Sequence, residues 1–207
     1  MRVIIFTWEY PPRVVGQLAQ YTSSLATQLV KKKTDTYIVT YHPQLTGSVE
    51  ELNGAKITRV ANPVATHIGI LTWVLTLNEE VERQAANIYY QTRNIDLIDV
   101  YDWHFIPAAV TLKNALGVPF IFSVDSIEDH RSHGANAPYN MAIKGIEWLG
   151  FYECSAITVK SEWMCDEIKK IYNVPEEKIR FIAPNKNGWI TSLLKVYTEI
   201  SGGSAPK

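Results

Sequence analysis

The chain has 207 residues and a formal net charge of -1, with 46% hydrophobic and 20% charged residues. This globular composition allows a good core in one large domain, with two small domains as the alternative. The balanced charge argues against a nucleic-acid partner, and the lack of an apolar run of roughly 18 residues argues against a membrane span.

Strand-like apolar runs alternate with helix-like patterns along the chain. In chain order, the predicted elements are a strand at 3–6, a helix at 18–32, strands at 36–40 and 55–60, a helix at 71–90, a strand at 97–100, a helix at 106–116, a strand at 120–124, a helix at 139–154, a strand at 156–159, a helix at 161–172, a strand at 179–182 and a helix at 189–200. The alternation at 55–60 indicates a half-exposed strand. We therefore predict a Rossmann-like α/β fold, with a doubly wound, mostly parallel sheet of six or seven strands in a three-layer arrangement.

The first strand leads through a loop that contains proline and glycine into a helix start. Such a turn presents unpaired backbone N–H groups to a phosphate, and Gly16 lets a ligand approach the backbone closely. An ordinary strand-to-helix connection is the alternative interpretation.

Two later strands end in residues that can bind a ligand, because open α/β sheets bind ligands at the carboxyl ends of their strands. Asp102, Trp103 and His104 follow the strand at 97–100. The alternative is that Asp102 caps the next helix and Trp103 packs beneath it.

The polar loop at 125–138 follows the strand at 120–124 and begins with three carboxylates, two imidazoles and one guanidinium within ten residues. Such a group can perform acid–base chemistry or bind a sugar, and it can equally be a solvated loop. His130 and His133 are spaced as two ligands on a helix would be, but no third ligand is evident. We expect neither a metal nor a cofactor.

Two cysteines, Cys154 and Cys165, lie 11 positions apart, which fits no metal site. We expect both to be buried and reduced, with a disulfide as the alternative. Since Met1 and Arg2 lead directly into a strand, we expect no signal peptide and a soluble, cytoplasmic protein.

Several segments resemble, in the right order, motifs of the glycogen and starch synthases and related retaining, nucleotide-sugar-dependent glycosyltransferases with the GT-B fold. The first loop resembles the family pattern S/T-x-E-x-x-P, a basic residue and Gly-Gly-Leu-Ala, matched by Thr7, Glu9, Pro11, Arg13, Gly16, Leu18 and Ala19. Residues 101–104 resemble H-D-W-H/L, and residues 159–164 resemble V-S-E-Y-M. Residues 146–153 resemble I-E-W-x-x-x-Y-E, and we predict that the aromatic spacing of four in this helix reflects core packing.

Two positions depart from the family pattern. The second glycine of the first loop is Gln17, whose side chain occupies space that the family keeps open for the sugar nucleotide. The family strand that ends T-I/V-H, with a histidine that contacts the transferring glucose, has Asp125 in that slot. A carboxylate accepts hydrogen bonds from sugar hydroxyls but cannot donate one as an imidazole does.

The resemblance implies an acceptor-side, N-terminal GT-B domain at 1–185 and a helix at 186–200 that resembles the family's crossover helix. The small, polar residues at 201–207 predict a disordered tail. Its partners would be ADP-glucose or UDP-glucose, a glucan acceptor and a C-terminal domain that this chain does not encode. The implied catalytic residue is Asp125. The implied substrate-binding residues are Arg13, Gly16, Gln17, Asp102, Trp103, His104, Glu128 and Arg131.

The implied activity is retaining transfer of glucose to the glucan, with little or no activity for this chain alone because half of the closed cleft is missing. One alternative is a non-catalytic carbohydrate-binding or regulatory module, in which Trp8, Tyr10 and Trp103 stack on sugars. Another is a structural domain that associates with a separate C-terminal subunit.

Overall fold

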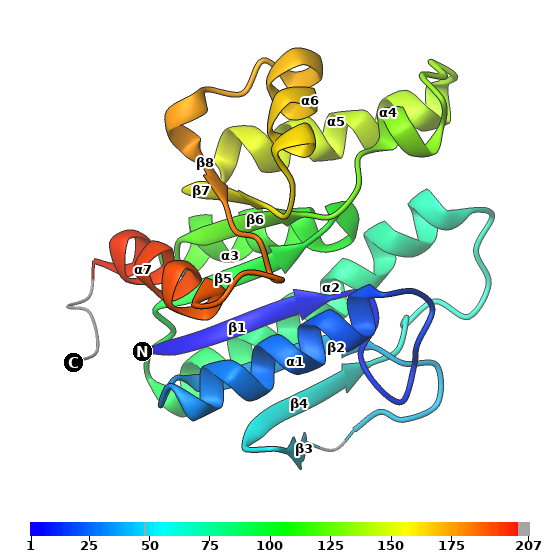
Figure 1. The fold of residues 1–207 in the computed structure, drawn as a ribbon. Helices are drawn as coiled ribbons and strands as arrows, with labels where there is room; N and C mark the ends of the chain where they lie inside the picture. Colours follow the sequence, from blue (N-terminus) through cyan, green and yellow to red (C-terminus); the bar gives the residue numbers. More distant parts are fainter. Residues whose placement is uncertain (48, 203–207) are drawn as a thin grey trace.

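Eight strands form one twisted sheet in the order β3-β4-β2-β1-β5-β6-β7-β8, in a computed structural model that describes residues 1–47 and 49–202 (Figure 1). The strands are β1 (Arg2–Thr7), β2 (Asp35–Tyr41), β3 (Val49–Leu52), β4 (Ala55–Val60), β5 (Leu97–Tyr101), β6 (Phe120–Val124), β7 (Ala156–Val159) and β8 (Ile179–Phe181). Only β3 pairs antiparallel to its neighbour among these strands. The predicted doubly wound, mostly parallel sheet is confirmed.

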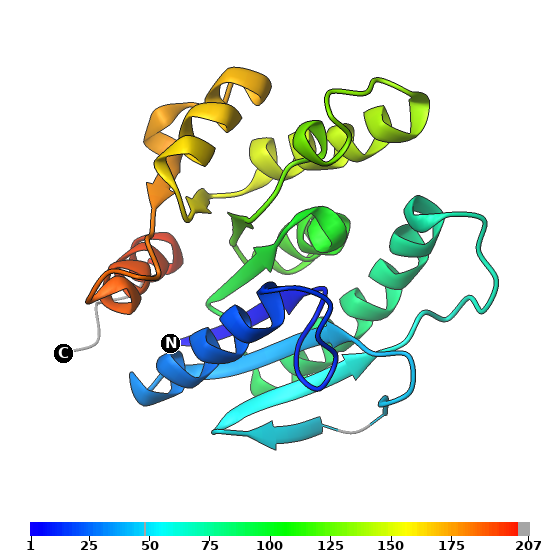
Figure 2. The same ribbon diagram turned by 45° about the vertical axis from the view of Figure 1, so that its right-hand side comes forward.

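Helices cover both faces of the sheet (Figure 2). They are α1 (Leu18–Lys31), α2 (Ile70–Thr92), α3 (Ile106–Leu116), α4 (Glu128–Arg131), α5 (Pro138–Glu153), α6 (Glu162–Tyr172) and α7 (Trp189–Ser201), with short 3-10 turns η1 (Trp103–Phe105) and η2 (Glu176–Lys178). Alternate residues of β1 separate the two cores: Ile4 and Phe6 pack with α2, α3, α5 and α6, whereas Val3 and Ile5 pack with α1 and α7. No helix in the described part of the chain is long and apolar enough to cross a membrane.

The edge strand β3 was not predicted from the sequence. Its residues, Val-Glu-Glu-Leu, are mostly exposed, so they lack the apolar pattern of a buried strand. Asn53 and Gly54 both have positive φ and connect β3 to β4 as a two-residue hairpin turn, a strong hairpin signal that the strand pattern obscured. The predicted half-exposure of β4 is also wrong, because α1 and α2 cover its two faces and five of its six residues are buried.

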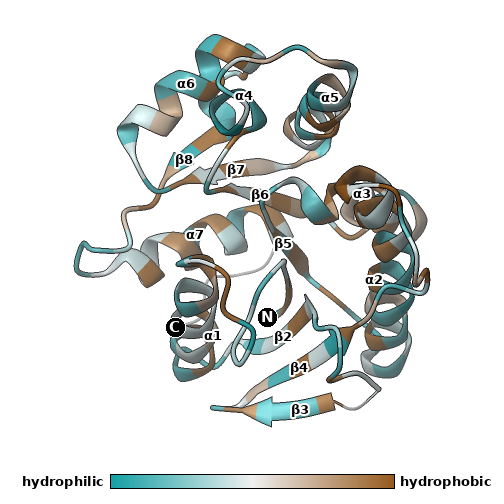
Figure 3. Cartoon of the chain, turned by 90° about the vertical axis from the view of Figure 1, so that its right-hand side faces the viewer, coloured by the Kyte–Doolittle hydropathy of each residue, from teal (hydrophilic) through white to brown (hydrophobic). Residues whose placement is uncertain are grey.

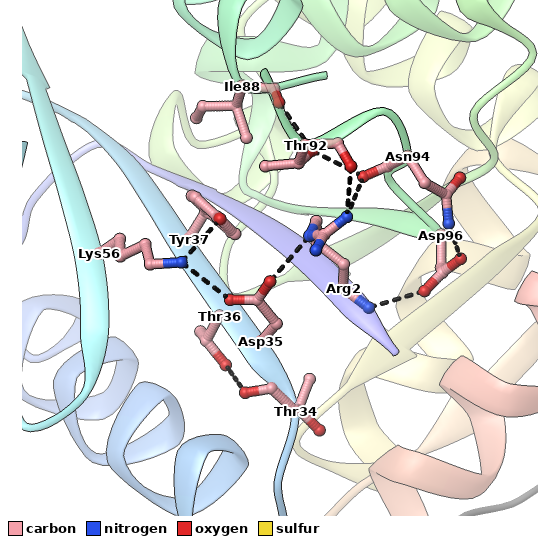
Figure 4. Close-up of polar contacts among 10 residues, drawn as sticks. All are labelled: Arg2, Thr34, Asp35, Thr36, Tyr37, Lys56, Ile88, Thr92, Asn94 and Asp96. Atoms are coloured by element: carbon pink, nitrogen blue, oxygen red, sulfur yellow. Dashed lines mark hydrogen bonds and ion pairs between the residues drawn. The ribbon is translucent and has the colours of Figure 1, made fainter. Parts of the chain in front are cut away.

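Arg2 fixes the edge at which the parallel strands begin (Figure 4). Its Nε lies 2.8 Å from Asp35 on β2, and its Nη1 donates to the carbonyl oxygens of Thr92 and Asn94 before β5. Lys56 on β4 contacts the same Asp35 carboxylate at 3.3 Å. These contacts tie β1, β2 and β4 to the segment that leads into β5.

The last helix, α7, packs against β5 and α1 and continues to Ser201, one residue beyond the prediction. The Tyr197 hydroxyl donates to the buried Asp99 carboxylate in the middle of β5. Residues 203–207, the rest of the predicted tail, lie outside the described residues.

Candidate functional site

The order of the strands reverses between β1 and β5, so the carboxyl edge of the sheet at this point is the expected ligand crevice. Figure 3 views the molecule from this edge, with α1 and α7 on one side of the sheet and α2, α3 and α5 on the other. Every predicted site residue lies just after β1, β5 or β6. The topology thus brings all of them to one edge.

Glu9 fills the centre of the loop after β1. Its carboxylate accepts hydrogen bonds from the backbone N–H groups of Val15 and Gly16, the latter at 2.6 Å. A Cβ at Gly16 would lie 3.3 Å from a Glu9 oxygen, so the glycine makes room for this carboxylate. The sequence predicted that a ligand would approach Gly16, whereas the protein's own Glu9 occupies that position.

The start of α1 remains open to solvent. Gln17 is exposed at the N-cap position and its side chain does not cap the helix. The first turn contains no acidic residue. The N–H groups of this first turn, at the positive end of the helix dipole, therefore have no acidic side chain of their own turn beside them, and the Glu9 carboxylate binds the N–H groups of Val15 and Gly16 just before it.

Arg13 folds back across aromatic rings rather than reaching into the crevice. Its guanidinium lies 4.8 Å from the ring centre of Trp8 and 4.9 Å from that of Tyr41, and its Nη1 donates to the Trp8 carbonyl oxygen at 2.8 Å. Burial lowers the pKa of this guanidinium. Arg13 thus stabilises the loop through cation–π contacts.

His104 stacks between Trp8 and Trp103, with ring centres 4.5 Å and 4.6 Å away. Burial lowers the pKa of His104 to about 3, so the imidazole is neutral near pH 7. Trp103 is 4% exposed and belongs to the core. The alternative prediction, that Trp103 packs beneath the next helix, is the one that agrees with its burial.

Asp102 positions the neighbouring loop. Its Oδ1 accepts hydrogen bonds from the backbone N–H groups of Asp125 and Ser126, at 2.9 and 3.1 Å. Its side chain does not cap the following turn, so the predicted capping role is wrong. Burial, with a smaller contribution from the Asp125 charge, raises the pKa of Asp102 to about 6.

Asp125 is exposed and forms an ion pair with Lys160, whose Nζ lies 2.5 Å from its Oδ1. Lys160 follows β7 and also lies 3.8 Å from the ring centre of Tyr21, in the first turns of α1. An ammonium group is a hydrogen-bond donor. The pair therefore offers both an acceptor and a donor beside the open start of α1.

Glu128 and Arg131 belong to α4, which lies within the segment predicted to be a loop. Arg131 donates to Glu128 at 3.1 Å, to Ser126 at 2.7 Å and to the fully buried Glu147 at 2.6 Å. Glu147 also accepts hydrogen bonds from the Glu128 backbone and the Tyr172 hydroxyl. Glu128 and Arg131 therefore hold α4 against α5, and only part of the Arg131 side chain faces solvent.

The two histidines of this segment do not meet. His130 contacts Glu167 at 2.8 Å and stacks on Trp163, whereas His133 is exposed with a positive φ. Within residues 1–47 and 49–202, no three His, Cys, Asp or Glu side chains gather as metal ligands. Cys154 is buried and Cys165 is only partly buried, and both thiols are free.

An aromatic pocket of about 410 Å³ lies beside these loops, on the side of β2 and α2. Trp8, Tyr41 and Trp73 form its inner wall, and Trp73 stands nearly perpendicular to the other two rings. His67, Ile68, Gly69 and Ile70 complete the lining. No carboxylate or amide side chain is part of it.

Some site residues were not predicted. Lys160 follows a strand end, so the rule that selected Asp125 also applies to it. Glu9 belongs to the family motif of the first loop, but no role was predicted for it. Tyr41 directly follows the predicted strand at 36–40, and Trp73 lies in the predicted helix at 71–90. Nothing in their local pattern indicates that their rings meet at the crevice.

Comparison with known proteins also indicates a glycosyltransferase. Residues 18–184 match the model of glycosyltransferase family 4. An uncharacterized glycosyltransferase from Methanocaldococcus jannaschii is 34% identical over 192 residues, covering 91% of this chain and 47% of the relative. A glycogen synthase from Mycobacterium tuberculosis is 24% identical over 187 residues, covering 83% of this chain and 45% of the relative. The chain thus spans about half the length of the curated relatives it matches.

Solved structures share the fold. A sucrose-phosphate synthase from Thermosynechococcus elongatus matches 90% of this chain and 48% of its own, with a TM-score of 0.71 and 14% identity. A fragment of that enzyme, named by the residue ranges 27–220 and 406–426, matches 96% of this chain and 98% of its own, with a TM-score of 0.67 and 13% identity. The catalytic domain of starch synthase IV from Arabidopsis thaliana, bound to ADP and acarbose, matches 96% of this chain and 50% of its own, with a TM-score of 0.56 and 12% identity. The chain belongs to glycosyltransferase family 4 and has the fold of a GT-B N-terminal domain.

Proposed function

We propose that this chain is the acceptor-side half of a glycosyltransferase that moves glucose from ADP-glucose or UDP-glucose to a glucan, with retention at the anomeric carbon. The observation on which this rests most is the clustering of open donor and acceptor groups at the carboxyl edge of the sheet, around the start of α1. The M. tuberculosis relative is named as a glycogen synthase, and the starch synthase structure holds ADP and acarbose. These names favour a glucose nucleotide and a glucan.

On the donor side, the free N–H groups of α1 suit a phosphate. The Asp125–Lys160 pair stands in the place of the family's histidine. Lys160 supplies the hydrogen-bond donor that Asp125 lacks, and the Asp125 carboxylate can accept from sugar hydroxyls. We assign these two residues to the transferring sugar and Gln17 to its phosphate.

On the acceptor side, we assign the exposed Arg131 edge and the aromatic pocket to the glucan. Asp102, Glu128 and Trp103 then act as positioning residues, since their polar groups or rings are already engaged within the protein.

A second domain is required in this proposal because both substrates must be held in one closed cleft. The relatives are about twice as long as the matched region. The two-segment fragment of sucrose-phosphate synthase covers nearly the same fold as this continuous chain. This similarity supports α7 as the equivalent of a crossover helix, and residues 1–185 as the domain it packs on.

A non-catalytic carbohydrate-binding module is the second candidate. Glu9 already occupies two N–H groups of the first loop, and Lys160 neutralises Asp125. Both contacts weaken the case for an active donor site. Tyr10 and Trp103 are too buried to stack on a sugar in such a module. His104 and Tyr41 stack on the Trp8 ring, so this module would contact a sugar through the part of Trp8 that lines the aromatic pocket.

A complementation assay tests the proposal. The chain is mixed with the part of the M. jannaschii relative that it does not match, and transfer of labelled glucose to maltoheptaose is measured. We expect transfer only in the mixture, a gain in rate for Gln17→Gly with Asp125→His, and at least a tenfold loss for Lys160→Met. Lys169→Met, on the outer side of α6, is the matched control. Equal rates for the chain alone and for the mixture would contradict the proposal.

A further inference from the structure

Lys160 is held at the crevice by an aromatic ring as well as by Asp125. Its Nζ lies 3.8 Å from the ring centre of Tyr21 on α1 and 2.5 Å from the Asp125 carboxylate. The Lys160 side chain is 27% exposed, so the ammonium lies near the surface between these two partners. Because a lysine side chain is a flexible four-carbon stem, the place of its ammonium depends on the groups around it.

The space behind Lys160 is nearly full. A cavity of about 10 Å³ lies there, between α1 and the strands β5, β6 and β7, with room for one water molecule at most. Tyr21, Tyr101, Ser123 and Thr158 are among the residues that line it. The Ser123 and Thr158 hydroxyls bond to each other at 2.6 Å. Lys160 therefore cannot withdraw toward the sheet while the Tyr21 ring is in place.

The Tyr21 ring has aromatic neighbours on two other elements. Its centre lies 5.7 Å from the ring centre of Tyr101 on β5 and 5.8 Å from that of Trp189, the first residue of α7. Tyr101 is almost fully buried, and Tyr21 and Trp189 pack partly buried against the same core. Since α7 lies beside α1 on this face of the sheet, the last helix contributes a ring to the support of a crevice side chain (Figure 3).

Anchors along α7 give Trp189 a fixed place. Gly188, with a φ of +83°, lets the helix begin directly before this residue. The apolar face of α7 is buried, and the Tyr197 hydroxyl donates to the buried Asp99 carboxylate. The position of the Trp189 ring is therefore set by the whole helix.

We propose that Tyr21 is a positioning residue that holds the Lys160 ammonium in the crevice, and that Trp189 of α7 supports Tyr21 in this role. The effect on glucose transfer rests on the proposed function, which assigns Lys160 to the transferring sugar. The Tyr21 ring attracts the ammonium through a cation–π contact and also blocks the space behind it. Removal of the ring lets Lys160 retreat from the crevice without removing a contact to the substrate.

The place of Lys160 can be measured by NMR of the 207-residue chain labelled at lysine. Hydrogens above the face of an aromatic ring give signals that the ring current moves upfield. The signals of the Lys160 Cε hydrogens are identified by their loss in Lys160→Met. We expect them to stay upfield in Tyr21→Phe, to move downfield in Tyr21→Leu, and to move less far in Trp189→Leu. Unmoved signals in Tyr21→Leu would overturn the inference.

The effect on transfer is measured in the complementation mixture with maltoheptaose as acceptor. We expect Tyr21→Leu to lower kcat at least tenfold and Trp189→Leu at least twofold. The KM for maltoheptaose should stay within twofold, because the acceptor contacts are unchanged. Tyr21→Phe keeps the ring and should retain at least a third of the original kcat.

A double substitution distinguishes positioning from a general loss of structure. If Tyr21 acts through Lys160, adding Tyr21→Leu to Lys160→Met should lower the rate no further. A further tenfold loss in the double variant would contradict the role, because Tyr21 would then act independently of Lys160.

Tyr152→Leu is the matched control. Tyr152 is 67% exposed at the end of α5, which leads into the start of β7 at the other edge of the sheet. The sequence predicted core packing for Trp148 and Tyr152, and this prediction is wrong because both rings lie on the exposed face of α5. Tyr152→Leu should leave the Lys160 signals and the rate unchanged. A loss of rate equal to that of Tyr21→Leu would overturn the role of Tyr21.

The two measurements separate this inference from the proposed function. Lys160 signals that depend on Tyr21, without any transfer by the original mixture, refute the proposed function alone. Transfer by the original mixture that Tyr21→Leu leaves at full rate refutes the positioning role alone.

Discussion

Asp102 and its neighbours show how single residues at the crevice divide between structure and chemistry. Asp102 and Glu9 both use their carboxylates to bind backbone N–H groups of crevice loops. Gln17 and Asp125 remain exposed. The sequence could place all of them at one edge because a strand end is visible in a local pattern. The sequence could not show which of these side chains bond to other groups of the protein, because the partners of each carboxylate come from distant segments or from the fold of the loop itself.

Substitution of Asp102 tests its role in holding the loop after β6. Asp102→Ala removes the acceptor of two backbone N–H groups, and we expect a loss of about 1–3 kcal/mol in the free energy of unfolding. Asp102→Asn keeps an oxygen in the same place and should stay close to the original stability at pH 7. Urea denaturation measures both, and equal losses would show that the contact does not hold the loop.

The buried carboxyl group of Asp99 predicts a pH dependence. Burial raises its pKa from 3.8 to about 6, so the folded state binds this proton more tightly than the unfolded state. Its contribution to stability is therefore greatest below pH 4 and falls as the pH rises to about 6, by roughly 3 kcal/mol. Asp99→Asn should reduce this slope in urea melts between pH 4 and 7, and Asp102, whose pKa burial also raises to about 6, accounts for part of the slope that remains. A variant with the original slope would assign the effect to another group.

Among the elements, the hairpin of β3 and β4 was the hardest to predict. The sheet order, the parallel strands and the long helices follow from apolar periodicity, which the core enforces. The edge strand has no such core, and its pairing depends on the turn at Asn53 and Gly54 and on contacts across the chain. Arg59 on β4 is one of these, since it bonds to Glu50 on β3 and to the Pro11 carbonyl oxygen in the loop after β1. The hairpin thereby supports the crevice from outside.

Glycine substitutions test the hairpin turn. Gly54 has a φ of +82°, and a Cβ there would lie 2.7 Å from a Val30 methyl group. Gly47 has a similar φ of +88°, with nothing within 4 Å of its Cβ position. Both substitutions to alanine should lower the free energy of unfolding by about 1 kcal/mol through backbone strain. Gly54→Ala should lower it by about 1–2 kcal/mol more because α1 must shift. Thermal denaturation compares the two, and equal melting temperatures would contradict the close packing of the turn against α1.

At the scale of the whole molecule, the candidate ligand-binding groups all lie at one edge of the sheet. Arg2 ties the strands together where they begin, and the opposite edge carries the open start of α1, the Asp125–Lys160 pair and the aromatic pocket. The family resemblance indicated the GT-B fold, and the comparisons confirm it. The arrangement of substrates about this edge is a proposal because it depends on a second domain.

The most direct test of this account is isothermal titration calorimetry of the chain with maltoheptaose and, separately, with ADP-glucose and UDP-glucose. We predict that maltoheptaose binds and that neither nucleotide sugar binds measurably, because the proposed function assigns the acceptor to this domain and most donor contacts to a second domain. Binding of a nucleotide sugar without binding of maltoheptaose would contradict the assignment of this domain to the acceptor.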